Sequence, residues 1–143
     1  MSTTTYSFGD VSVSISHPSV GQHVVSGEGL GGISVTMTTE RTVQDVAADG
    51  SIMVSKIKGR NGGVALTMQQ TSDLNKWLKR WYNHLESAST SQWAKTKVIV
   101  RSPVMGDLVT ATGVSPQKLP DKPWQAQGQN VVWNLMAADI QQD

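Results

Sequence analysis

Residues 71–87, which read TSDLNKWLKRWYNHLES, constrain the fold more than any other stretch because they alone follow a clear helical period. Their large apolar side chains recur every three or four positions and so share one face of a helix. These residues are Leu74, Trp77, Leu78, Trp81, Tyr82 and Leu85. Ser72 can cap the first turn, since its hydroxyl can accept a hydrogen bond from an amide that lacks a helical partner. We expect an amphipathic helix over about 72–86 whose apolar stripe packs on a core.

The other side of this predicted helix is basic. It carries Lys76, Lys79 and Arg80. Together with nearby basic residues it could form a nucleic-acid patch. A solvated helix face is the simpler interpretation, because the chain has a net charge of only +1 and no bulk attraction to nucleic acid or a membrane surface.

The remainder of the chain alternates between apolar and polar residues, which is the pattern of half-buried strands. The alternation is clearest in Ile33–Thr38 and Val64–Gln69. The predicted strands span 6–16, 33–38, 51–58, 64–69, 93–102, 108–114 and 129–137. We therefore expect a mainly β fold in a single domain, 1–143: a β-sandwich or partly closed β-barrel whose open side or end the helix covers.

The connections between these strands carry their own signals. We expect a glycine-rich loop over 20–32, a polar connection over 40–50 and a polar tail over 139–143. Asn61-Gly62 is a hairpin signal, so the strands at 33–38, 51–58 and 64–69 are predicted to form a meander. Gly113 suggests a β-bulge, and the prolines of 115–123 suggest an extended crossing.

The sequence contains no recognisable catalytic or metal-binding motif. His17, His23 and His84 lack metal-ligand spacing, the carboxylates are scattered, and there is no cysteine. We therefore predict no catalytic residue, no metal, no cofactor and no enzyme activity. The N-terminus lacks the features of a signal peptide, and no apolar run could span a membrane, so we expect synthesis in a cytoplasm without membrane insertion.

Tryptophan is frequent, with five residues, and this raises a carbohydrate-binding alternative through ring stacking. Trp77, Trp81 and Trp133 lie in apolar patterns that core packing explains. Trp124, beside Pro123, is the tryptophan expected to be exposed.

The two clearest strands also have a polar face without charge. Its residues are Ser34, Thr36, Thr38, Ala65, Thr67 and Gln69. Exposed sheet faces usually carry Lys, Glu or Arg for solubility. An uncharged, non-adhesive face would suit the wall of a channel.

Four segments of the chain resemble, in order, the tail tube proteins of contractile-tailed bacteriophages. They read YSFGDVSVSISHP, DGSIMVSKIKGRNGGVALTMQQTSDLNKWL, TKVIVRSPVMGDLVTATGVSPQKLPDKPW and VVWNLMAADI. The resemblance rests on the whole pattern and covers most of the chain. Tubes of bacteriocins and type VI secretion systems share the architecture.

The resemblance implies a structural function. Six copies would form a ring, sheet edge to sheet edge, and rings would stack into a hollow tube inside a contractile sheath, with DNA passing down the channel. The uncharged face would line that channel, and Lys76, Lys79 and Arg80 would contact the sheath or a neighbouring subunit. Segments 20–32 and 40–50 would reach an adjacent ring and be mobile in the free subunit. The location would be the virion tail, after synthesis in the host bacterium. The alternative left open is a β-sandwich carbohydrate-binding module of a virion or adhesin.

Overall fold

The computed structural model describes residues 2–27 and 29–143, and their fold is mainly β with one long helix. The strands are β1 (Ser12–His17), β2 (Gly21–Val25), β3 (Leu30–Met37), β4 (Thr42–Val46), β5 (Ile52–Lys56), β6 (Gly62–Gln69), β7 (Thr96–Ser102), β8 (Asp107–Pro116) and β9 (Asn130–Gln142). The helix α1 spans Asp73–Ser87, and short 3-10 turns cover Phe8–Asp10 and Thr90–Gln92. The predicted fold class is confirmed.

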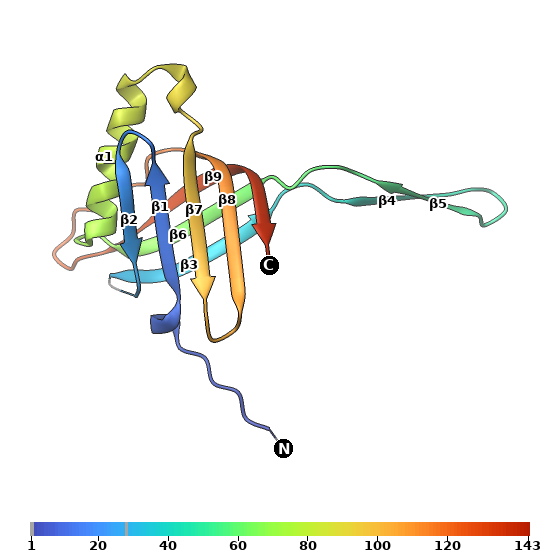
Figure 1. Cartoon of the computed structure of the whole chain (residues 1–143), viewed down its shortest axis with the longest axis horizontal. Coiled ribbons are helices and arrows are strands. Elements are labelled where there is room, and N and C mark those ends of the chain that lie inside the picture. Colours follow the sequence, from blue (N-terminus) through green and yellow to red (C-terminus); the bar gives the residue numbers. More distant parts are fainter. Residues whose placement is uncertain (1, 28) are drawn as a thin grey trace.

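Seven strands form one antiparallel sheet in the order β2-β1-β7-β8-β9-β6-β3. The sheet curls, so that β1, β2, β7 and β8 lie in front of β3 and β6, and β9 curves forward from β6 to end beside β8 (Figure 1). Its two halves face each other across one core, which is consistent with a β-sandwich. The sheet does not close into a barrel, because β2 and β3 remain as edges that do not pair with each other.

The core draws on both halves of the sheet and on α1. From the sheet it includes Val13, Ile15, Val64, Leu66, Met68, Val98, Trp133 and Leu135. From the helix it includes Leu74, Trp77, Leu78, Trp81 and Leu85, whereas Tyr82 is half-buried. Two buried indoles also find partners: Trp81 Nε1 donates to Thr96 Oγ1 at 2.8 Å, and Trp133 Nε1 donates to Asn75 Oδ1 at 2.9 Å.

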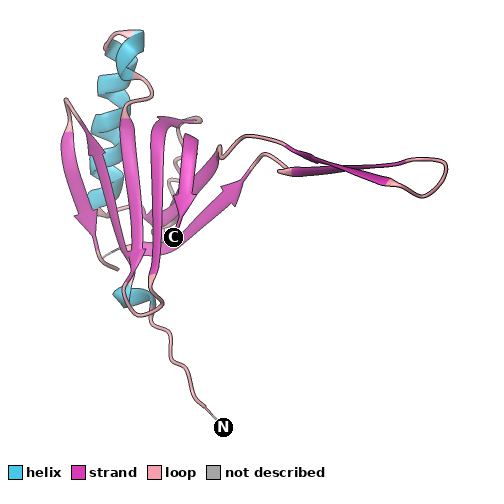
Figure 2. Ribbon diagram, turned by 45° about the vertical axis from the view of Figure 1, so that its right-hand side comes forward, coloured by secondary structure: helices cyan, strands magenta, loops and turns pink. Residues whose placement is uncertain are grey.

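The meander prediction was wrong. β3 pairs directly with β6, while β4 and β5 pair only with each other and form an arm that leaves the body (Figures 1 and 2). The Asn61-Gly62 signal marks close packing instead of a hairpin. A Cβ on Gly62 would lie 2.1 Å from the carbonyl oxygen of Thr36, so glycine is needed there for β3 and β6 to approach. The polar connection expected over 40–50 contains β4 and the arm's turn.

The loop predicted over 20–32 and the tail predicted over 139–143 were wrong in their bounds, because strands occupy parts of both. The β-bulge predicted at Gly113 was confirmed. Segment 20–32 contains β2 and the start of β3, and β9 continues to Gln142 through the expected tail. At Gly113 the register between β7 and β8 shifts, and Gly113 has a φ of +63°. Within the described residues, no helix has the length and apolar character needed to cross a membrane.

Candidate functional site

The histidines contribute to packing and hydrogen bonding in the described part of the chain. His17 is buried; its Nε2 lies 3.1 Å from the Gln92 carbonyl oxygen, and its Nδ1 accepts from the Ser19 amide at 3.1 Å. Its ring meets His84 edge-on, and His23 stacks on Trp77. Among residues 2–27 and 29–143, no group of three or more potential ligands could hold a metal ion.

The structure brings four of the channel-lining candidates together on the outward face of β3 and β6. Ser34 pairs with Ala65, while Thr36 and Thr67 lie along the same two strands. All four are exposed or half-buried. Thr38 follows the end of β3 and Gln69 ends β6, so these two candidates lie at the margins of the face.

β9 and β8 extend this face, and sequence reasoning missed their contribution. Ala65 pairs with Asn134, Thr67 pairs with Val132, and Met136 pairs with Ser115 of β8. We call the outward-facing residues Ser34, Thr36, Gly63, Ala65, Thr67, Ser115, Val132, Asn134 and Met136 the uncharged face, since none carries a charge. The alternation in β9 was visible in the sequence. The position of β9 beside β6 could not be predicted, because the two strands lie far apart in the chain.

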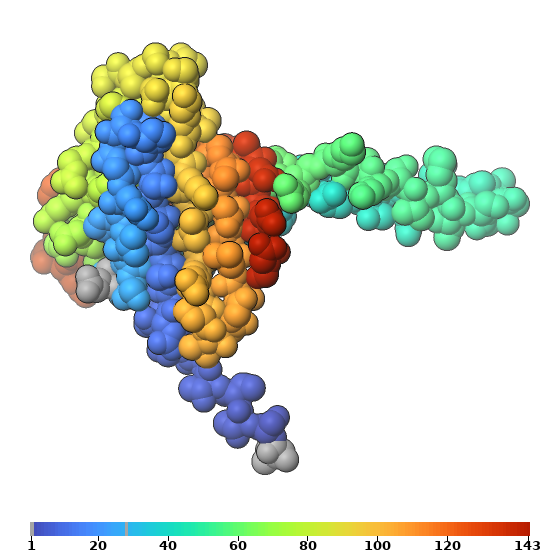
Figure 3. Space-filling view, viewed as in Figure 1, coloured from blue at the N-terminus to red at the C-terminus, as the bar shows by residue number. Residues whose placement is uncertain are grey.

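The β4–β5 arm is the most exposed part of the molecule and yet is rich in apolar residues. It projects as a separate limb in the space-filling view (Figure 3). Val46 and Ile52 are cross-strand partners, 65% and 58% exposed, and Met53 and Val54 are equally open. Isolated two-stranded hairpins are marginally stable in water, and exposed apolar patches mark interaction sites. The arm therefore has the character of a binding element.

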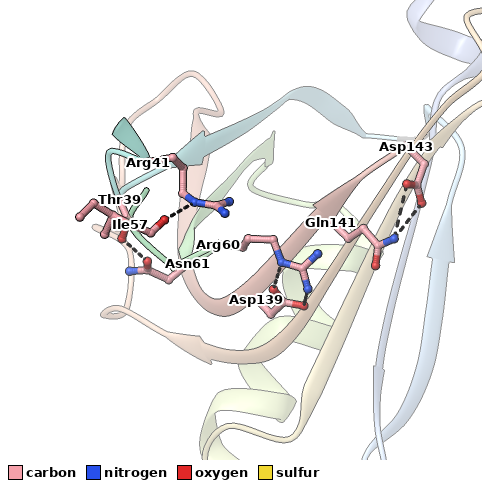
Figure 4. Close-up of polar contacts among 8 residues, drawn as sticks. All are labelled: Thr39, Arg41, Ile57, Arg60, Asn61, Asp139, Gln141 and Asp143. Carbon is pink, nitrogen blue, oxygen red and sulfur yellow. Dashed lines mark hydrogen bonds and ion pairs between the residues drawn. The ribbon is translucent and has the colours of Figure 1, made fainter. Parts of the chain in front are cut away.

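Hydrogen bonds fix the root of the arm to its own strands (Figure 4). Arg41 Nε donates to the Ile57 carbonyl at 2.6 Å, and the Ile57 amide donates to the Arg41 carbonyl at 2.9 Å. Thr39 Oγ1 donates to Asn61 Oδ1. These contacts hold the two connecting segments together where they leave the body.

A second set of contacts ties the root to β9. The Ile140 amide donates to the Arg60 carbonyl at 2.7 Å. The Arg60 guanidinium forms a two-point ion pair with Asp139, at 2.8 Å from Nε and 3.1 Å from Nη2 (Figure 4). These contacts fix the root of the arm against β9, while the rest of the arm projects away from the body.

Charge is segregated along the arm. The distal part, 45–53, carries Asp45 and Asp49 and no basic residue. Near the root, the basic residues Arg41, Lys56 and Lys58 outnumber the single acidic residue Glu40. The Ser51 amide donates to Asp49 Oδ1 at 3.0 Å, and this bond lowers the pKa of Asp49. The tip is therefore acidic at neutral pH.

The basic residues predicted on the helix are divided by the structure. Lys76 and Lys79 line a groove between α1 and the 117–129 segment, together with Lys122, whereas Arg80 is exposed outside it. Val131 and Trp133 also line this groove, and so does Trp124, which is 86% exposed as expected. We call this feature the lysine groove.

Buried polar contacts hold the lysine groove in shape. Gln70 Nε2 donates to the Pro123 carbonyl at 2.7 Å and so attaches the 117–129 segment to the body. Asn75, which is buried, accepts from Trp133 and donates from Nδ2 to the Gln70 carbonyl at 2.9 Å. The sequence alone did not reveal the groove, because the 117–129 segment lies far from α1 in the chain.

Comparisons with known proteins point to one structural class. The family model described as Bacteriophage PhiTE tail tube protein matches residues 1–143. No curated protein matches the sequence. The fold is similar to a chain of the anti-feeding prophage (AFP) baseplate, 6-fold symmetrised, with a TM-score of 0.61 and 16% identity over 99% of this chain and 97% of that one.

A second structural neighbour comes from an extracellular contractile injection system, the PVC sheath-tube complex in its extended state. The TM-score is 0.56 and the identity 12%, over 93% of this chain and 87% of that chain. A chain of the PVC sheath/tube terminator in the extended state matches with a TM-score of 0.57 and 11% identity, over 93% of this chain and 92% of that one. At such identities these neighbours establish a shared fold.

Proposed function

Because the chain belongs to the Bacteriophage PhiTE tail tube protein family, we propose that six copies form a ring and that rings stack into a hollow tail tube. The family consists of structural proteins and not enzymes, and its members belong to the phage tail. The match over residues 1–143 is the observation that carries the proposal. A six-fold assembly is supported by the structural neighbour in a 6-fold symmetrised baseplate.

The two free sheet edges supply a way to close the ring. β2 and β3 lie at opposite ends of the strand order, and each leaves backbone groups without a strand partner in the subunit. In a cyclic ring every contact is heterologous, so the β2 edge of one subunit meets the β3 edge of the next.

The uncharged face lines the channel in this proposal. It includes the candidates Ser34, Thr36, Ala65 and Thr67, with Thr38 and Gln69 at its margins. Proteins that hold DNA neutralise its phosphates with Lys and Arg. A wall without these residues makes no such contacts, so DNA can pass without being retained.

The remaining surfaces serve stacking and the sheath. The arm reaches an adjacent ring, is mobile in the free subunit and becomes ordered when rings stack. Segment 20–32 contains β2 and the start of β3, so it contributes to the ring edges. Arg80, with Lys76 and Lys79, faces the contractile sheath or a neighbouring subunit. The fold neighbour in a sheath-tube complex supports a sheath partner.

Electron microscopy of the concentrated protein, combined with light scattering, tests this function. We expect rings or tubes with a central hole, and a ring mass six times the 15.4 kDa of one chain. A protein that stays monomeric at every concentration and binds glycans would instead support the carbohydrate-binding alternative. That alternative rests on Trp124 and has no support from the family match.

A further inference from the structure

The lysine groove is open, and none of its three lysines forms an ion pair with a described residue of its own subunit. It encloses about 390 Å³, which falls in the range of ~300–1,000 Å³ typical of binding pockets. Its lining includes Lys76, Lys79 and Lys122 and no carboxylate. The sole ion pair between described residues joins Arg60 to Asp139, at the root of the arm. A ligand for this groove should therefore combine an apolar part with negative charge.

The tip of the arm has this combination. Val46, Ile52 and Val54 lie on one face of the hairpin, because Val46 pairs with Ile52 and Gln44 pairs with Val54. Asp49 lies in the turn, and Asp45 lies on the opposite face beside Val46. The root is basic, so a groove rimmed by lysines would attract the tip and repel the root.

We propose that the arm tip of one copy docks in the lysine groove of a second copy. The apolar pair Val46 and Ile52 covers Trp124, and the carboxylate of Asp49 in the turn faces the lysines. This inference rests on the proposed assembly and adds the pairing of two particular surfaces. It assigns Lys76 and Lys79 to a neighbouring tube subunit and leaves Arg80 for another partner.

The placement of the two surfaces requires two copies. The arm extends to the right of the body, whereas the 117–129 segment lies at the left, behind the helix (Figure 1). A subunit cannot bring its own tip into its own groove. Two different surfaces on opposite sides make a heterologous contact, which propagates from copy to copy in a ring or a stack.

Another exposed apolar element offers a competing occupant. The β7–β8 turn carries Val104 and Met105, 62% and 52% exposed, next to Asp107. This turn connects two strands of the body directly and does not project as the arm does (Figure 1). We favour the arm because it extends beyond its own subunit and carries two carboxylates.

Disulfide trapping tests the pairing directly, because the chain has no cysteine. Ala48→Cys in the tip and Gln125→Cys in the groove are introduced together, and assembled protein is oxidised. We expect a ladder of covalent multimers on a non-reducing gel. Val104→Cys with Gln125→Cys is the matched control and should remain monomeric on the same gel.

Charge reversal supplies an independent test. Lys76→Glu with Lys122→Glu should raise the concentration needed for assembly by roughly tenfold or more, since like charges then face each other. Asp49→Lys should do the same, and the three changes together should restore assembly. Lys95→Glu, at an exposed position outside the groove, should leave assembly unchanged. Circular dichroism checks that each variant is folded.

The outcomes separate this inference from the proposed function. Tubes that form but give no ladder with Ala48→Cys and Gln125→Cys, or a ladder with Val104→Cys instead, would overturn the docking and leave the tube function intact. An effect of Lys95→Glu equal to that of the groove variants, or no rescue by the three changes, would also overturn it. Absence of rings or tubes in the unaltered protein would overturn the proposed function itself.

Discussion

The body and the arm are both built from antiparallel strands, but they use their side chains in opposite ways. In β1 and β6 every second residue is buried, as in a sheet that covers a core. In β4 all five residues are exposed, and in β5 four of five are. Burial of apolar area is the main source of folding free energy. The body therefore holds the stability of the subunit, and the arm is an extension available for binding.

The largest expected effect lies at the centre of the body. Trp81 is fully buried, and its indole donates to Thr96. Trp81→Ala should lower the free energy of unfolding by about 3–5 kcal/mol, because it leaves a cavity and an unpaired hydroxyl. Urea unfolding followed by circular dichroism measures the loss. Trp124→Ala, at an exposed position, is the control and should change stability by less than about 0.5 kcal/mol. If both variants lost the same free energy of unfolding, the buried core of the body would not be the main source of stability.

A smaller loss is expected where the arm rejoins the body. Gly62→Ala places a methyl group 2.1 Å from the Thr36 carbonyl oxygen and 2.9 Å from Ile140. Forcing β3 away from β6 should cost about 1–3 kcal/mol. Gly63→Ala is the neighbouring control, since its Cβ would come no nearer than 3.4 Å to another atom. Thermal melts of the two variants provide the comparison, and similar melting temperatures would show that the strands adjust freely.

A substitution at the start of α1 should lower the free energy of unfolding by less than Gly62→Ala does. Ser72 Oγ accepts from the Asn75 amide at 3.2 Å, and Ser72 itself is buried. Ser72→Ala removes this cap and should cost about 1 kcal/mol in urea unfolding. Ser72→Asp keeps an acceptor at the same position, so it should lose less than Ser72→Ala. The reverse order would mean that packing at this site matters more than the cap.

The sequence pattern predicted features that depend on neighbouring residues, such as the faces of a helix or strand. It did not predict which distant segments of the chain lie together. The helical period identified the apolar residues that α1 buries, although Tyr82 of the predicted stripe is half-buried and Asn75 is also buried. The alternation of 64–69 identified the two faces of β6. The pairing of β3 with β6 could not be read in this way, because the arm intervenes and Asn61-Gly62 imitates a hairpin turn. The lysine groove likewise depends on the bond from Gln70 to the Pro123 carbonyl, which joins residues far apart in the chain.

The uncharged face should tolerate a change that the core would not. Thr67 is half-buried on β6 and points away from the core. Thr67→Lys should change the free energy of unfolding by less than about 0.5 kcal/mol, because a long side chain there can extend into water. Thr36→Lys on β3 should behave alike. Insoluble protein from either variant would show that this face is covered within the subunit.

The smallest effect on stability should come from the arm, although its apolar residues are as large as many in the core. Val46→Ser with Ile52→Ser should leave urea unfolding unchanged within about 0.5 kcal/mol when it is followed by tryptophan fluorescence, because all five tryptophans lie outside the arm. Amide hydrogen exchange of the arm should be fast in the unaltered monomer and fast in the variant, since local opening is independent of the body. Stacked tubes should protect the arm amides of the unaltered protein, and the variant should not form them. A loss above about 1 kcal/mol in the monomer would place the arm against the body and remove the distinction between the two regions.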